Sequence, residues 1–173
     1  MTEPERRERL LEPLKMALKL EQEGRRYFRE AADSAESRQA RQTFEFLAAE
    51  ENKHIERINE FYQSIKDTGG TEPAQIDPAE GTEQRLGAFN NELAKLKSEV
   101  KPTTSDIEAY RVALKFENGA EQLYARQLEE TDNQHVREFF AWLIQEEGIH
   151  ARVLKSCLQF AEDPAGWFKK RGK

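Results

Sequence analysis

The chain carries one pattern of acidic and histidine residues twice, at a constant offset of 96 residues. Residues 17–21 read Ala-Leu-Lys-Leu-Glu, and residues 113–117 read Ala-Leu-Lys-Phe-Glu. Residues 50–54 read Glu-Glu-Asn-Lys-His, and residues 146–150 read Glu-Glu-Gly-Ile-His. Because no insertion separates the two matches, we expect each repeat to form the same helical hairpin.

The length and composition of the chain favour a single helical domain. Its 173 residues are close to the size of one domain. Hydrophobic residues make up 37% and charged residues 35%, a balance typical of long amphipathic helices. We therefore predict one all-α domain over residues 1–173, in which the two repeats are halves of one bundle.

Apolar residues at alternating three- and four-residue spacings predict four long helices. The first is expected to begin near Glu12 and Pro13, because proline is tolerated in a first helical turn. A capping sequence at 104–106 should open the third helix, and Pro164 should stop the fourth. Six acidic and histidine residues occupy core positions of these helices: Glu21, Glu51, His54, Glu117, Glu147 and His150.

Each hairpin is expected to fold about its midpoint. The two core glutamates of each hairpin lie 15 residues on either side of a polar stretch, around residue 36 in the first hairpin and residue 132 in the second. With a rise of about 1.5 Å per residue, both glutamates lie roughly 22 Å from their turn. The two sets of side chains should therefore meet in the middle of the bundle.

A long connection separates the hairpins. It contains several glycines and prolines and then a polar helical piece from Thr82 to about Val100. Such a length can start the third helix parallel to the second, as in ferritin-like bundles, and it could also let two chains exchange hairpins. The expected segments are hairpin one at about 12–67, the crossover at 68–103, hairpin two at 104–163 and a tail at 164–173, whose aromatic residues should dock on the bundle.

Six buried acidic and histidine side chains need a common explanation, because burying unpaired charge costs several kcal/mol. Four carboxylates balance the charge of two divalent ions, and two imidazoles add neutral nitrogen ligands. The absence of thiolate among the ligands favours iron, or manganese, over a structural zinc site. We therefore predict two iron ions, although manganese or zinc could occupy the site in a recombinant sample. Two adjacent redox metals can pass two electrons to peroxide or dioxygen.

Other charged residues near this pattern are expected to have less direct roles. Glu50 and Glu146 precede the predicted ligands and are expected at the rim of the site. Glu121 lies one turn after the third-helix ligand and is expected to pair with Arg25, with a fifth carboxylate near the metals as the alternative.

Five further residues are expected to lie outside the ligand set. Tyr27, Tyr110 and Tyr124 should pack in the core with satisfied hydroxyls, the alternative being donors or electron relays at the site. His135 is expected at the surface, and Cys157 is expected to fill the core.

Charge and cysteine content exclude several other functions. A net charge of −6, with one basic cluster at 169–171, gives no footprint for nucleic acid. One cysteine allows neither an intrachain disulfide nor a Cys-x-x-Cys metal site. No apolar run suggests a signal peptide or a membrane span, so we expect a cytoplasmic protein without membrane attachment.

The repeated motifs, together with Gly24, Phe28, Tyr124 and a terminal Asp-Pro-x-x-Trp-Phe, resemble the rubrerythrin-like branch of the ferritin-like proteins over about residues 12–168. The resemblance implies that the six core residues are di-iron ligands, with Glu51 and Glu147 as bridging carboxylates. It also implies peroxide as the substrate and a homodimer, with exchanged hairpins as one arrangement. A rubredoxin-type protein or a flavin reductase would supply electrons.

The chain departs from the pattern of full-length rubrerythrins in two ways. It lacks the four cysteines of a rubredoxin-like domain, which makes an external electron donor necessary. It also has Ala120 where rubrerythrins carry an additional glutamate, and it supplies His150 in the manner of bacterioferritin. Ferroxidase activity with iron handling is therefore an alternative. A non-catalytic interaction or sensor module stabilised by metal is an alternative of another class.

Overall fold

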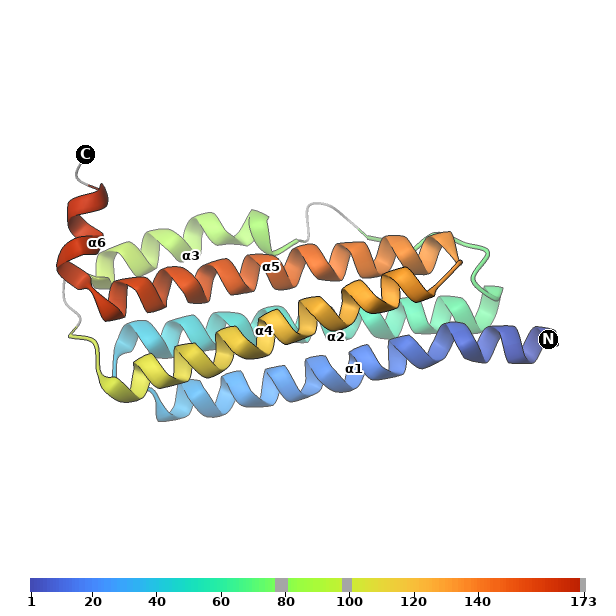
Figure 1. Ribbon diagram of the computed structural model, residues 1–173, viewed down its shortest axis with the longest axis horizontal. Coiled ribbons are helices and arrows are strands. Elements are labelled where there is room, and N and C mark those ends of the chain that lie inside the picture. The colour runs from blue at the N-terminus through green and yellow to red at the C-terminus, as the bar shows by residue number, and fades with distance from the viewer. Residues whose placement is uncertain (77–80, 98–100, 172–173) are drawn as a thin grey trace.

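The structure, a computed structural model, describes residues 1–76, 81–97 and 101–171. The described residues form helices and no strands, which confirms the all-α prediction. Four long helices form a bundle, and a shorter helix lies along it (Figure 1). The helices are α1 (Glu3–Ser34), α2 (Arg38–Thr68), α3 (Thr82–Lys97), α4 (Thr104–Glu130), α5 (Gln134–Glu162) and α6 (Pro164–Arg171).

Helix α1 begins earlier than its sequence pattern predicted. It starts at Glu3, not near Glu12, because Thr2 and Glu5 form a capping box that satisfies free backbone N–H groups at the helix start. The helix then continues through Pro13. The predicted start was wrong because the polar beginning of the helix has no apolar periodicity. The capping residues Thr2 and Glu5 were the sequence signal that would have placed the start correctly.

The two hairpins have the turns predicted from their midpoints. Residues 35–37 join α1 to α2, and residues 131–133 join α4 to α5. Ser37 caps α2 and Asn133 caps α5 through their side-chain oxygens. Short turns of this kind hold each pair of helices antiparallel, so the core residues of one helix lie at the height of those of the next.

The connection between the hairpins makes α4 parallel to α2 (Figure 1). The Asp106 carboxylate, near the start of α4, accepts hydrogen bonds from the backbone N–H groups of Glu36 and Ser37 at 3.0 and 2.9 Å. At the other end of the bundle, the Asn133 amide donates to the Gly70 carbonyl at 2.9 Å. These contacts fix the ferritin-like arrangement. The hydroxyl of Thr103 caps α4, while Asp106, predicted as part of that cap, ties α4 to the first turn.

The crossover leaves α2 through Gly69, whose φ of 67° lies in the left-handed region that glycine adopts without strain. Its helix α3 begins at Thr82 as predicted and packs against α2 and α5. The predicted helix end near Val100 falls outside the described residues.

Two apolar clusters fill the bundle and leave a polar layer between them. One cluster contains Phe28, Phe44, Tyr110 and Leu154, and it includes Cys157 as a buried filler, as expected. The other is built around core side chains nearer the opposite end: Leu14, Ile58, Phe61, Tyr124, Phe140 and Leu143. The six predicted ligands lie in the layer between the clusters, at mid-bundle.

The end of the chain, expected as a tail at 164–173, forms a short helix, α6. Trp167 and Phe168 contact the Phe160 ring edge-on, with centroid distances of 5.5 and 5.9 Å, so the aromatics do dock on α5. None of the helices that the structure describes is both long and apolar enough to span a membrane.

Candidate metal centre

All six predicted ligands converge at the centre of the bundle. Each of the four long helices contributes at least one of them: Glu21 from α1, Glu51 and His54 from α2, Glu117 from α4, and Glu147 and His150 from α5. Every one of these side chains is at most 1% exposed. The structure thus brings together the six residues that the repeat predicted as ligands. Their role in binding metal remains a prediction.

The first histidine points one ring nitrogen at carboxylates from both hairpins. Nδ1 of His54 lies 2.9 Å from Glu21 Oε2, within its own hairpin. The same atom lies 3.1 Å from Glu147 Oε1, across the bundle. The i,i+3 spacing of Glu51 and His54 puts both on the inner face of α2, which is why this ring reaches the centre.

The second histidine repeats this geometry with the hairpins exchanged. Nδ1 of His150 lies 3.2 Å from Glu117 Oε1 in its own hairpin and 3.1 Å from Glu51 Oε1 in the other. Glu147 Oε2 lies 3.5 Å from the same nitrogen. The two oxygens of Glu147 therefore face one histidine each, as a carboxylate between two metal ions would.

Four of these residues form a group compact enough to hold an ion. One ligand atom from each of Glu51, His54, Glu147 and His150 lies within 4.8 Å of the others. Glu21 and Glu117 extend the group at either side through their contacts with His54 and His150. Pairs of Glu-x-x-His motifs with one further glutamate per hairpin are the ligand set of dinuclear sites in helix bundles.

The metal-free site is electrostatically crowded. Burial raises the pKa of Glu51 and of Glu117 well above the usual value, and neighbouring carboxylates raise both further. Burial disfavours the charged form of Glu147, but hydrogen bonds with His150 and His54 hold its pKa well below the usual value. Burial also opposes protonation of both histidines, yet their carboxylate partners raise the pKa of each imidazole well above its normal range.

Protein groups alone do not satisfy this site. Three buried carboxylate oxygens have no donor in hydrogen-bonding geometry among the described residues: Glu51 Oε1, Glu117 Oε2 and Glu147 Oε1, although the first and the last each lie 3.1 Å from a histidine Nδ1. Buried oxygens without a hydrogen bond are costly unless a cation completes them. The donor set contains four carboxylates, two imidazoles and no sulfur, which suits two divalent ions of the iron or manganese type.

The two neighbouring glutamates, predicted at the rim of the site, are held by residues outside the predicted ligand set. Glu50 and Glu146 are 1% and 4% exposed, so both are buried beside the predicted ligands. The Nε atom of Arg85, on α3, donates to both oxygens of Glu50 at 2.7 and 2.9 Å, and Lys53 Nζ lies 2.9 Å from Oε1. Burial opposes ionisation of Glu50, but these cations lower its pKa to about 2.

Glu146 has a different set of partners. Its Oε2 accepts hydrogen bonds from the backbone N–H of Thr82 at 2.9 Å and from the Thr82 hydroxyl at 2.6 Å. It also lies 3.4 Å from His54 Nε2. Thr82 and Arg85 were not among the predicted site residues, because the crossover lies outside the repeat. The adjacent glutamates at 50–51 and 146–147 could have indicated that such partners exist, since each buried carboxylate requires a partner.

Tyr124 is completely buried with a satisfied hydroxyl, as expected, and it also fits the alternative of a donor at the site, because its hydroxyl donates to Glu21 Oε1. One prediction near the site was wrong. Arg25 donates to the Asn52 side chain at 2.8 Å in place of the expected pair with Glu121. Tyr27 is only partly buried against the apolar cluster, but its hydroxyl is satisfied as expected, since it donates to the Ala109 carbonyl at 3.0 Å.

The remaining two expectations concern residues away from the site. Tyr110 is 2% exposed and packs against Phe44, as expected of a core residue. His135 was expected at the surface, yet its side chain is only 28% exposed and lies 3.8 Å from Glu138.

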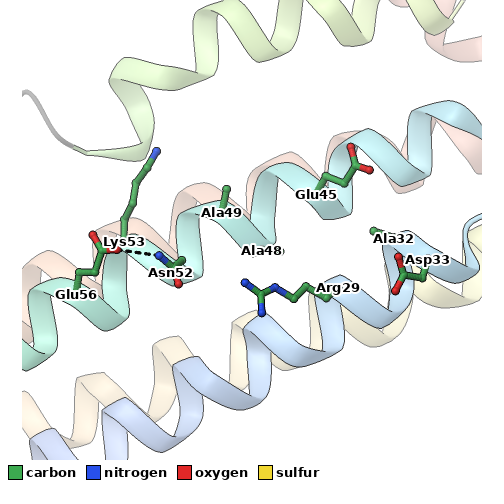
Figure 2. A pocket seen from close by; sticks show the side chains of 9 residues that line it. All are labelled: Arg29, Ala32, Asp33, Glu45, Ala48, Ala49, Asn52, Lys53 and Glu56. Atoms are coloured by element: carbon green, nitrogen blue, oxygen red, sulfur yellow. Dashed lines mark hydrogen bonds between the residues drawn. The ribbon is translucent and has the colours of Figure 1, made fainter.

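Two surface hollows lie near the centre. A groove of about 690 Å³ runs over the α1–α2 pair, with small residues such as Ala48 and Ala49 along it and Asn52, Glu56 and Asp33 towards its ends (Figure 2). None of the six predicted ligands lines it. A smaller pocket of about 260 Å³ does reach the site, because its lining includes His54 and Glu146.

The sequence of this bundle matches one known protein family. The family model described as rubrerythrin matches residues 12–158. The chain belongs to the rubrerythrin family. The match covers all four long helices in whole or large part and contains every predicted ligand, while α6 lies beyond it. Comparisons with curated proteins and with solved structures found no match. Membership in the rubrerythrin family and the buried Glu/His cluster together support a non-haem di-iron protein.

Proposed function

We propose that this rubrerythrin-family protein is a di-iron peroxidase that reduces hydrogen peroxide to water with electrons from an external donor. The observation that carries this proposal is the position of Glu147, whose two oxygens face His54 and His150. Such a carboxylate suits a pair of adjacent ions better than a single one. Two bound ferrous ions would supply the two electrons that one peroxide requires.

The burial of the site supports a small oxidant. All four predicted carboxylate ligands are at most 1% exposed, so an organic substrate would have to displace packed helices to reach them. Reduction of peroxide balances as H₂O₂ with two electrons and two protons giving two water molecules. The pocket beside His54 and Glu146 is a short route from solvent for such small species.

The reaction requires a source of electrons. We propose a rubredoxin-type protein or a flavin reductase as the donor, because each reduction of peroxide consumes two electrons that must be replaced. Iron is the proposed native metal and the cytoplasm the proposed compartment. We also propose a homodimer, in which exchange of hairpins would keep every ligand contact while building each site from two chains.

Ferroxidase activity is the second candidate, and one observation favours it. Ala120, 2% exposed, takes the place of the additional glutamate of rubrerythrins, and the second hairpin supplies His150 in its stead. This symmetrical ligand set resembles that of bacterioferritin. Oxidation of ferrous iron by dioxygen, followed by release or transfer of ferric iron, would use the same residues.

The two activities separate in stopped-flow oxidation of the diferrous protein. Protein loaded with two ferrous ions per chain without oxygen is mixed with peroxide or with dioxygen, and the near-ultraviolet absorption of ferric iron is followed. A peroxidase reacts faster with peroxide and turns over when a reductant is supplied. Faster oxidation by dioxygen identifies a ferroxidase, and inertness towards both identifies a non-catalytic metal-stabilised module.

A further inference from the structure

The two halves of the duplicated site are not supported in the same way. Glu50 and Glu146 are equivalent residues of the repeat, each directly before a Glu-x-x-His glutamate. Glu50 is held by Arg85 and Lys53, whereas Glu146 is held by Thr82. Because α3 occurs once, it gives the two equivalent glutamates different partners.

The Thr82 side chain joins His150 to the carboxylate that His54 contacts directly. Its hydroxyl donates to Glu146 Oε2 at 2.6 Å and lies 3.4 Å from Nε2 of His150. Nε2 of His54 lies 3.4 Å from the same Glu146 oxygen. Thr82 is completely buried, so both contacts of its hydroxyl lie in the interior of the protein.

The donors and acceptors of this cluster can be assigned without conflict. Nδ1 of each histidine faces the central carboxylates, which leaves the hydrogen of each ring on Nε2 when Nδ1 binds a metal. His54 then donates to Glu146, and His150 donates to the Thr82 hydroxyl, which donates onward to Glu146. The Nε2 atoms of both histidines are therefore connected to the Glu146 carboxylate, directly for His54 and through the Thr82 hydroxyl for His150.

We propose that Thr82 is a positioning residue for the metal centre, which orients His150 directly and links it to Glu146, the residue that orients His54. The inference rests on the proposed dinuclear site and adds that the crossover helix makes its two metal positions inequivalent. The position served by His54 is backed by a carboxylate, and the position served by His150 by a hydroxyl. Groups that hold the outer nitrogen of a ligating histidine alter metal affinity by about 10- to 100-fold.

The test is an anaerobic titration of the metal-free protein with Co²⁺, followed by its visible absorption. The wild-type protein should bind two ions per chain. Thr82→Val removes the hydroxyl but keeps the backbone N–H that holds Glu146, so one ion should bind about 10- to 100-fold more weakly while the other is retained. Thr82→Ser restores the hydroxyl and should bind both ions within about threefold of wild type.

Thr43→Val is the matched control. Thr43 is also completely buried, and its hydroxyl donates to the Gln39 carbonyl at 2.9 Å within the apolar cluster, away from the metal centre. It should leave both cobalt affinities unchanged. A second variant, Glu146→Gln, should weaken both ions, because a neutral amide oxygen accepts hydrogen bonds less strongly than a carboxylate. If Thr82→Val does not fold, Glu146→Gln still tests whether Glu146 supports both histidines.

The outcomes are distinct. Selective loss of one ion in Thr82→Val, with recovery in Thr82→Ser, supports the proposal. Wild-type affinities in Thr82→Val or in Glu146→Gln would overturn it, as would equal weakening of both ions in Thr82→Val and Thr82→Ser. Fewer than two ions bound by the wild-type protein would contradict the dinuclear site itself.

Discussion

The imidazole rings of His54 and His150 stack with centroids 5.0 Å apart and an angle of 10° between their planes. They come from equivalent positions of the two hairpins, and their Nδ1 atoms both face the central carboxylates. Glu147 contacts both rings, while Glu51 contacts His150 from the opposite hairpin. A site of this kind depends on both hairpins at once.

Removing either central carboxylate should therefore abolish binding of a metal pair. In Glu51→Ala or Glu147→Ala, the iron content after anaerobic loading should fall from two ions per chain to one or fewer, because only one of the two central carboxylates remains to balance the charge of the pair. Glu60→Ala is the control, since the Glu60 side chain is 61% exposed on α2. Two ions per chain in either site variant would show that the ligands are misassigned.

Much of this site could be predicted from the sequence because its ligands interrupt an apolar periodicity. Glu21 and His54 stand where core residues belong, and the repeat at a fixed offset made chance placement of such residues improbable. The partners on α3 could not be predicted in this way. Thr82 and Arg85 occur once, in a segment without strong periodicity, and only tertiary packing brings them to Glu146 and Glu50.

The tyrosine at the site should influence the metal through Glu21. The Tyr124 hydroxyl donates to Glu21 Oε1, so Tyr124→Phe removes a hydrogen bond that holds one predicted ligand. We expect a loss of about 1 kcal/mol in unfolding free energy and weaker binding of one ion. Tyr27→Phe is the control, because the Tyr27 hydroxyl bonds a backbone carbonyl away from the ligands. Equal cobalt affinities in the two variants would argue against a role for Tyr124.

The ion pair between α3 and α2 should contribute strongly to stability. Glu50 is 1% exposed and depends on Arg85 and Lys53 for its charge. Arg85→Met should lower the unfolding free energy by about 3–5 kcal/mol, because it leaves a buried carboxylate with one partner. The exposed pair between Arg111 and Glu108 provides a contrast, and Arg111→Met should cost at most about 1 kcal/mol. Denaturant unfolding of both variants gives the comparison, and similar losses would contradict it.

The stability of the metal-free protein should depend on pH in a specific direction. The pKa values of His54, His150, Glu51 and Glu117 are all raised in the folded state. A raised pKa stabilises the fold below the unfolded pKa and loses this contribution as pH rises through the folded pKa. The melting temperature of the metal-free protein should therefore fall from about pH 6.5 to pH 9, a range that begins at the normal pKa of histidine.

Metal loading provides the internal control for that measurement. Bound ions require deprotonated ligands, so the loaded protein should not lose stability over the same range. Adding a chelator should return the loaded protein to the metal-free profile. A metal-free melting temperature that rises with pH would show that the buried groups are not held in the protonated forms described.

Anomalous diffraction from crystals of the iron-loaded protein tests the central claim most directly. Data collected on either side of the iron absorption edge should show two peaks per pair of hairpins, flanked by the carboxylates of Glu51 and Glu147, with His54 Nδ1 beside one peak and His150 Nδ1 beside the other. A single peak, or peaks outside this layer of the bundle, would contradict the dinuclear centre.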